Sequence, residues 1–216
     1  MIKRCVSLLI IMNISFVYAI LGGVGINVIQ DGFTLDGETF DGPEGIASVT
    51  RTDVGSPVGI GAFVYLTIIP FVDFEASANF TASSYNYEYQ DALGGNEEVP
   101  LGFGKFTWNL SAQKPIFKIP TIRIYAGAGL NGASYTKIVT YETMKNLDPD
   151  QLNDMDYVKE ELGVSTQGFH LELGGRFKPP IIPFSINVNA RYNFIQDLVP
   201  GEDGFLSLSA GFAFAI

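Results

Sequence analysis

The stretch from Asp73 to Ser83 reads Asp-Phe-Glu-Ala-Ser-Ala-Asn-Phe-Thr-Ala-Ser. Its even positions are apolar, and its odd positions are charged or polar. A period of two residues over this length is typical of a β-strand that has one apolar face and one polar face. The stretch therefore predicts a strand between two different environments.

The same alternation recurs in seven further segments of the chain. They are Val24–Val28, Val58–Ile68, Lys105–Gln113, Ile122–Asn131, Phe169–Phe177, Phe184–Phe194 and Leu206–Ile216. Most of these segments reach the length of about 9 to 11 residues that a tilted strand needs to cross a membrane. Beyond the first residues no run of about 18 apolar residues exists, so the hydrophobic content of 47% comes without a transmembrane helix.

The connections between the eight segments alternate in length. Three are short and contain proline, at Ile69–Phe71, Lys114–Pro120 and Lys178–Pro183. The others are longer, at Gln30–Ser56, Tyr87–Pro100, Lys137–Ser165 and Gln196–Gly204. Short turns at one end and long loops at the other are typical of outer-membrane barrels. The sequence thus predicts an all-β fold, a closed eight-stranded antiparallel up-and-down transmembrane β-barrel with both chain ends on the short-turn side.

The first 19 residues have the pattern of a cleaved signal peptide. Lys3 and Arg4 form a basic head, and an apolar stretch too short to span a bilayer follows. Val17 and Ala19 supply the small residues expected before a cleavage site. We expect cleavage after Ala19, which leaves residues 20–216 as one barrel domain; the alternative is a buried N-terminal strand. The only cysteine, Cys5, leaves with the signal peptide.

Charge is distributed unevenly along the chain. Of the 23 acidic residues, 20 fall in the four long connections, which hold only four basic residues. The short-turn side carries Lys114, Lys118 and Lys178. We therefore expect one strongly acidic rim at the long-loop end.

The signal peptide, the eight alternating segments and the last strand with Phe212, Phe214 and Ile216 resemble the small outer-membrane barrels of the OmpA/OmpX type. Ile216 departs from the terminal phenylalanine of that family but keeps the alternation. The resemblance implies a place in the outer membrane of a Gram-negative-type cell. It also implies partners, which are outer-membrane lipid, lipopolysaccharide and the outer-membrane assembly machinery. No periplasmic domain is expected after the last strand.

The polar faces of the strands place charged residues inside the predicted barrel. They are Asp73, Glu75, Lys105, Arg123, His170, Glu172, Arg176 and Arg191. Eight strands leave an interior just wide enough for side chains, and unpaired charges are costly to bury. We expect a polar network in the lumen, either a plug of ion pairs or a gate on a narrow ion path. Taking Phe177 opposite Phe184 fixes the register there, and Glu172 then lies beside Asn189 and diagonal to Arg191.

The sequence favours no enzymatic activity and no cofactor. His170 is the only histidine, and no set of serine, histidine and acid can be placed from the spacing. One histidine and no mature cysteine argue against a zinc site. Loop carboxylates such as Asp31, Asp36 and Asp41 could hold calcium, but they lack EF-hand spacing, so solvated acidity is preferred. No basic stripe or phosphate loop points to nucleic acid.

Two further features bear on the ends of the barrel. Aromatic girdles are expected at both membrane interfaces, with Tyr85, Tyr87 and Tyr89 near the long-loop end of their strand. Phe71 is expected at the short-turn end. The lipid-facing set is Trp108, Phe177, Phe184, Phe212 and Phe214. In the third long loop, Asp148-Pro149 and an apolar stripe ending at Leu162 predict a short helix over the barrel mouth.

Three functional hypotheses follow from these patterns. The first is a non-enzymatic envelope protein whose acidic surface loops serve a structural, adhesive or interaction role. The second is a small, porin-like channel for ions or solutes. The third is a soluble exported barrel that binds an apolar ligand, which would turn the apolar stripes inward.

Overall fold

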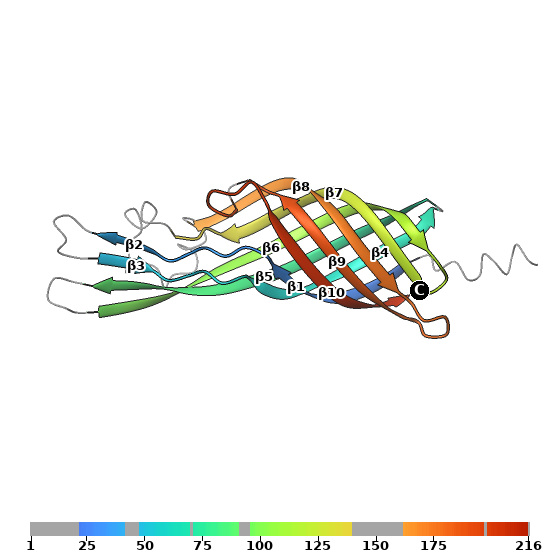
Figure 1. Cartoon of the computed structure of the whole chain (residues 1–216), viewed down its shortest axis with the longest axis horizontal. Helices are drawn as coiled ribbons and strands as arrows, with labels where there is room; N and C mark the ends of the chain where they lie inside the picture. Colours follow the sequence, from blue (N-terminus) through green and yellow to red (C-terminus); the bar gives the residue numbers. More distant parts are fainter. Residues whose placement is uncertain are drawn as a thin grey trace, which may run out of the picture.

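The computed structural model describes residues 22–41, 48–69, 71–90, 96–139, 162–196 and 198–215. Within them, ten strands form one antiparallel sheet (Figure 1). The strands are β1 (Gly22–Asp31), β2 (Glu38–Asp41), β3 (Ser48–Arg51), β4 (Val58–Ile69), β5 (Val72–Gln90), β6 (Asn96–Lys118), β7 (Ile122–Thr136), β8 (Gly163–Phe177), β9 (Phe184–Phe194) and β10 (Phe205–Ala215). The predicted signal peptide lies outside the described residues.

Eight of these strands close into a ring. Each pairs with its neighbour in the order β1, β4, β5, β6, β7, β8, β9 and β10, and β10 returns to β1. The closing register runs from Gly23 opposite Ala215 to Asp31 opposite Ser207. A closed ring leaves no unpaired edge, so every strand finds partners for its backbone groups on both sides. The predicted closed, eight-stranded, antiparallel barrel is confirmed.

The sheet continues beyond the ring at the long-loop end, here called the loop end. There β5 and β6 stay paired as far as Gln90 and Asn96, while β6 pairs with β7 only from Lys105 onward. Strands β2 and β3 form a hairpin on β5, so the four strands make a projecting sheet (Figure 1). The predictions of loops at Gln30–Ser56 and Tyr87–Pro100 are therefore partly wrong, because cross-strand pairs such as Tyr87 with Val99 extend the ladder.

The opposite end, here called the turn end, differs from prediction at one connection. Strand β6 runs through the expected turn to Lys118, with an irregular register between Pro115 and Phe117. Proline has no amide hydrogen to donate, and a bulge accommodates it without ending the strand.

At the loop end, β8 begins at Gly163, inside the expected connection. Residues 140–161, where most of the predicted helix falls, lie outside the described residues.

The outer surface of the ring is apolar. Ile26, Ile60 and Leu130 are 70%, 69% and 61% exposed, while polar side chains of the same strands are buried inside. This orientation contradicts the soluble ligand-binding barrel, which needs the apolar stripes to face inward. On β7 the apolar outer face gives way to Ser134, whose hydroxyl lies 2.9 Å from that of Ser165. Polar outer residues there mark the end of the apolar belt.

Among the described residues, no helix is long and apolar enough to cross a membrane.

The direction of the faces is tested by placing a charge on the belt. Replacing Ala126 by Arg sets a cation on the outer face of β7, between Ile124 and Ala128. In lipid this change should cost about 2–4 kcal/mol of barrel stability. Urea unfolding of the barrel in phospholipid vesicles measures it. The matched control is Ser134→Arg on the same strand above the belt, which should cost less than about 1 kcal/mol. Equal losses for both variants would show that the belt is misplaced.

Candidate functional site

The barrel interior holds a polar network at mid-height. Glu172 accepts hydrogen bonds from Gln113 at 3.0 Å, from Asn189 at 2.9 Å and from the Nη2 of Arg191 at 2.8 Å. Glu75 accepts one from Gln113 at 3.1 Å and lies 3.4 Å from the Nη2 of Arg191. Two buried carboxylates thus share one guanidinium, and every oxygen of Glu172 has a donor.

The register between β8 and β9 differs from the expected one by two residues. Phe177 lies opposite Ile186 instead of Phe184, and Glu172 lies opposite Arg191. Phe184 therefore lies beyond the last residue pair between β8 and β9, which is Phe177 with Ile186. The shift keeps every side chain on its predicted face but makes the contact between Glu172 and Arg191 a direct cross-strand ion pair.

Toward the turn end, the interior charges are arranged around aromatic rings. Arg123 contacts Asp73, and Arg176 lies 3.6 Å from Glu75. The guanidinium of Arg176 also stacks over the Tyr65 ring, 3.5 Å from its centre. Tyr65 fits there because position 23 is glycine: a Cβ on Gly23 would collide with the tyrosine ring. The glycine thus positions the ring that holds Arg176.

Toward the loop end, a second ion pair is fully enclosed. Lys105 and Asp31 lie 2.6 Å apart, with side chains 2% and 0% exposed. Thr81 and Ser207 donate hydrogen bonds to Asp31 at 2.8 and 2.6 Å. The prediction that Asp31 contributes solvated acidity to a long loop is therefore wrong. Its odd position extends the inward face of β1, a signal that the glycine after it obscured. No group of three potential metal-binding residues occurs among those described.

His170 has a partner that sequence reasoning missed. Its Nε2 lies 2.9 Å from the hydroxyl of Ser111 and 4.0 Å from Glu172, and the side chain is fully buried. In a catalytic triad the acid binds the other ring nitrogen. Here the Nδ1 of His170 has no partner among the described residues. The three residues therefore meet without the geometry that activates a serine.

Above these charges, a cluster of apolar side chains fills the loop end of the lumen. Its buried members are Phe33, Val54, Tyr85, Tyr87, Phe103, Ala133, Tyr135, Ile138, Val139, Leu162, Ile195, Leu198, Val199 and Phe205. Tyr85 and Tyr87 are 3% and 2% exposed, so their prediction as members of an outer girdle is wrong. Burial raises the pKa of Tyr87 to about 12, and its hydroxyl donates a hydrogen bond to the carbonyl of Val139. We call this set the apolar cap.

No protein-family model matches the sequence, and no curated protein matches it either. Among solved structures, the chain is similar to Ail, the attachment invasion locus protein of Yersinia pestis, in complex with the heparin analogue sucrose octasulfate. That match has 11% identity and a TM-score of 0.50, and it covers 90% of this chain and 97% of Ail. The chain is also similar to the outer membrane protein OprG from Pseudomonas aeruginosa, with 13% identity, a TM-score of 0.50 and coverage of 90% and 94%. The fold is that of a small outer-membrane β-barrel.

Aromatic side chains stand on the outer surface of the barrel. Phe177, Phe184, Phe212 and Phe214 are 44%, 52%, 63% and 47% exposed. The ring of Phe184 meets that of Phe214 edge to face, with centres 5.5 Å apart. Trp108 projects from the outer face of β6, where a Cβ on Gly132 of the neighbouring strand would collide with its indole.

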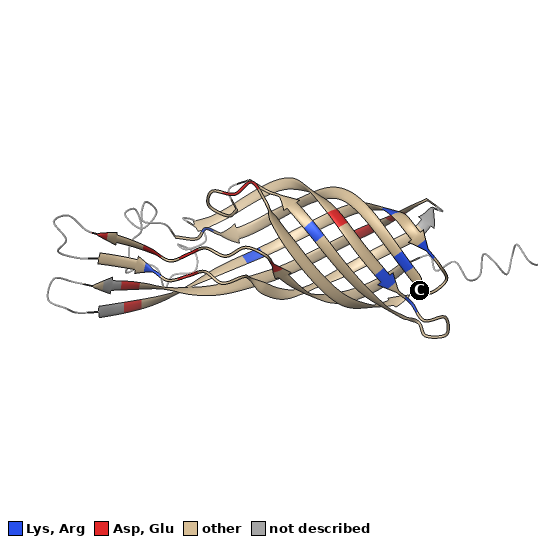
Figure 2. Cartoon of the chain, in the orientation of Figure 1, with Lys and Arg blue, Asp and Glu red and all other residues tan. Residues whose placement is uncertain are grey.

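Charge separates along the barrel axis (Figure 2). At the loop end the exposed acids are Asp36, Glu38, Asp41, Asp53, Glu88, Glu98, Glu202 and Asp203. Lys137 is the exposed basic residue among those described at that end, since Arg51 is buried and donates to the Asp36 carbonyl at 2.7 Å. The turn end carries Lys114, Lys118, Arg123 and Lys178. The barrel is thus acidic at one end and basic at the other.

The enclosed pair of Lys105 and Asp31 gives a test of charge balance in the lumen. Lys105→Met leaves a buried carboxylate without its cation, which should cost about 3–5 kcal/mol. Adding Asp31→Asn removes that charge, so the double variant should recover most of the loss. Urea unfolding of Lys105→Met, Asp31→Asn and the double variant gives the free energies of unfolding for a double-mutant cycle.

Lys137→Met is the control for loss of a lysine, because Lys137 is exposed; its cost should stay within about 0.5 kcal/mol. Additive losses for the two single variants would contradict a coupled pair.

Proposed function

We propose that the chain is an integral outer-membrane protein without enzymatic activity, whose projecting sheet contacts a partner with a basic surface. In this proposal the signal peptide directs export and is removed after Ala19. The barrel then anchors the sheet in lipid, with the turn end toward the periplasm and the loop end outside. The function is adhesive or interactive, and the lumen network serves as a structural plug.

The observation that carries the proposal is the acidity of the projecting sheet. Glu88 on β5 lies directly opposite Glu98 on β6, and both side chains are exposed. Like charges at such a position destabilise a strand pair. A cationic partner that binds both carboxylates would remove this repulsion and stabilise the strand pair.

Within the described residues, two strand edges have no neighbouring strand and add a way to bind. Strand β2 ends the sheet on one side, and residues 96–101 of β6 lie beyond its pairing with β7 on the other. Exposed edges present unpaired backbone groups that another chain can extend. Acidic residues on these strands would discourage self-association and favour a basic partner.

The absence of enzymatic activity is supported by the environment of the one serine–histidine pair. His170 is 0% exposed, and it lies on the lumen side of β8, away from lipid. A substrate would need to pass either the apolar cap or the charged lumen to reach Ser111. Because the carboxylate and the hydroxyl share one ring nitrogen, the pair is better suited to filling space with hydrogen bonds.

Binding to charged surfaces tests the proposed partner. Ail was solved with a sulfated polyanion, which the acidic loop end of this chain should repel. The detergent-solubilised barrel should bind a polylysine-coated sensor through its acidic loop end, while any binding to a heparin-coated sensor should come from the basic turn end and stay unchanged when loop-end acids are removed. The triple variant Glu38→Gln, Glu88→Gln and Glu98→Gln should lower the association rate constant about 3- to 10-fold at low salt.

The control for this experiment is Glu202→Gln with Asp203→Asn and Asp36→Asn, which removes three exposed charges of the same end from outside the strands. A smaller effect is expected for the control. If both triple variants slow binding equally, the sheet is not the contact surface. Binding to polylysine that is unchanged in the triple variant of the sheet would overturn the proposal.

The channel alternative rests on the polar lumen and has its own test. The apolar cap fills the loop end with fourteen buried side chains, and a dry constriction opposes the passage of ions. The purified barrel in a planar bilayer should therefore give no stable conductance at about 1 M salt, where the Debye length is only about 3 Å. Discrete, stable current steps would show that the lumen network is a gate and not a plug, and that the chain is a channel and not an adhesive protein.

A further inference from the structure

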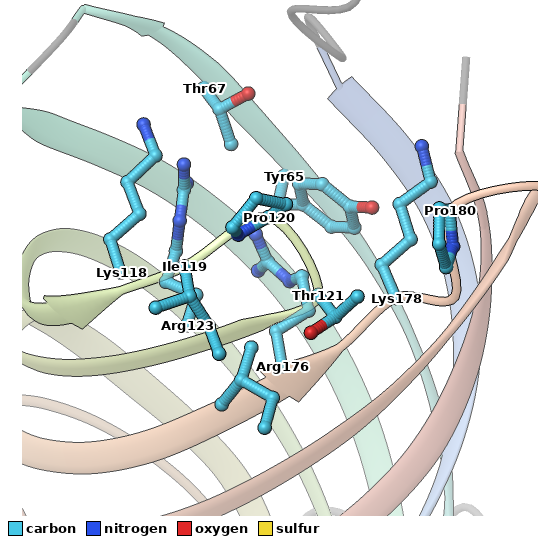
Figure 3. A pocket seen from close by; sticks show the side chains of 11 residues that line it. Tyr65, Thr67, Lys118, Ile119, Pro120, Thr121, Arg123, Arg176, Lys178 and Pro180 are labelled. Atoms are coloured by element: carbon cyan, nitrogen blue, oxygen red, sulfur yellow. The ribbon is translucent and has the colours of Figure 1, made fainter.

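The lumen opens at the turn end into a cavity of about 620 Å³. Its walls come from the ends of β4, β6, β7 and β8 and from the turns between them (Figure 3). Four of the lining residues are cationic, namely Lys118, Arg123, Arg176 and Lys178. None of the described residues that line it is acidic.

The charges of this cavity are not balanced within the described part of the chain. Asp73 neutralises Arg123, and Glu75 is shared between Arg176 and Arg191. Lys118 and Lys178 have no ion-pair partner there, and Figure 3 shows them on opposite sides of the cavity. Burial lowers the pKa of Lys178 from its ordinary value. The mouth therefore carries two cations that lack a counter-charge.

Arg176 forms the inner wall of the cavity and keeps unused donors. It is 6% exposed, and its Nε donates to Asn187 at 2.7 Å. Its Nη1 has no hydrogen-bond partner among the described residues, and its Nη2 lies 3.6 Å from Glu75, an ion-pair contact too long for a hydrogen bond. Stacking on Tyr65 fixes the plane of the guanidinium. A buried guanidinium with free donors is costly unless an acceptor reaches it.

The remaining walls define the shape of a ligand. Ile119, Pro120, Ile122 and Pro180 are apolar, while Thr121 adds a hydroxyl. The volume falls within the range of about 300–1,000 Å³ that is common for small-molecule sites. A phosphate monoester carries a charge of about −1.5 to −2 at neutral pH and three acceptor oxygens. Such a group matches two unpaired lysines and the free donors of one arginine.

We infer that the turn-end cavity is a binding site for a phosphate monoester attached to a small, partly apolar group. The site faces the periplasm in the proposed membrane orientation and lies at the opposite end from the projecting sheet. Its phosphate could come from a soluble ester or from the headgroup of phosphatidic acid in the adjoining leaflet. Lys118 and Lys178 capture the ligand at the mouth, and Arg176 receives the phosphate from within.

Two arms of one experiment test the site and separate these sources. In the first, the full chain in phosphatidylcholine nanodiscs is titrated with glycerol 3-phosphate by isothermal titration calorimetry. In the second, native mass spectrometry counts the lipids retained by protein reconstituted in equal parts of phosphatidic acid and phosphatidylcholine. Binding in the first arm alone indicates a soluble ester, and selective retention in the second alone indicates the lipid headgroup. Both outcomes support the site, whereas no binding in either arm overturns it.

Variants show whether this cavity is responsible. Lys118→Gln with Lys178→Gln should weaken binding at least about tenfold, since each lost charged hydrogen bond is worth that much or more. The control is Lys114→Gln, because Lys114 stands on the outer face of β6 at the same end and does not line the cavity. Heat-modifiable gel migration checks that each variant is folded. If Lys114→Gln weakens binding as much as the double variant, the affinity comes from the basic rim and the inference is wrong.

Discussion

The pairing of β1 with β10 is the constraint on which the rest of the structure depends. In lipid no water is available to satisfy free amide and carbonyl groups, so an open sheet cannot cross. The register from Gly23 to Asp31 against β10 closes the ring, and closure allows the apolar residues to face outward. Beyond the apolar belt, backbone groups no longer need a partner within the sheet. There, within the described residues, β2 and residues 96–101 of β6 have an edge without a neighbouring strand, which water can solvate.

Closure also dictates the chemistry of the interior. An eight-stranded ring leaves a lumen filled by side chains, and the inward positions of these strands are largely polar. The described ion pairs join four carboxylates to four cations: Asp31 with Lys105, Asp73 with Arg123, and Glu75 and Glu172 with Arg176 and Arg191. The membrane-level interior is thus balanced in charge. The excess charge lies at the two ends, acidic where the sheet projects and basic where the cavity opens.

The apolar cap gives the two ends different roles. It separates the acidic sheet from the polar lumen, so the two proposed binding sites, on the sheet and in the turn-end cavity, lie on opposite sides of it. Residues of the cap come from four strands, β5, β6, β7 and β10, and from the segments between strands, such as those near Phe33, Val54 and Leu198. Long loops that fold back over the mouth therefore close the barrel and at the same time support the sheet that projects past it.

The sequence by itself determined the number of strands in the ring, the two faces of each of those strands and the asymmetry of charge; it did not reveal β2 and β3. The strands and their faces follow from local alternation, because residues two positions apart in a strand lie on the same face. The fold and the inward positions of residues such as Glu172 and Arg191 were therefore predictable. What only the tertiary structure decided are relations between distant strands: the shift of Phe177 to Ile186, the burial of Asp31 against Lys105, and the meeting of Ser111 with His170. Alternation assigns a face but not a register, because a slip of two residues leaves every face unchanged.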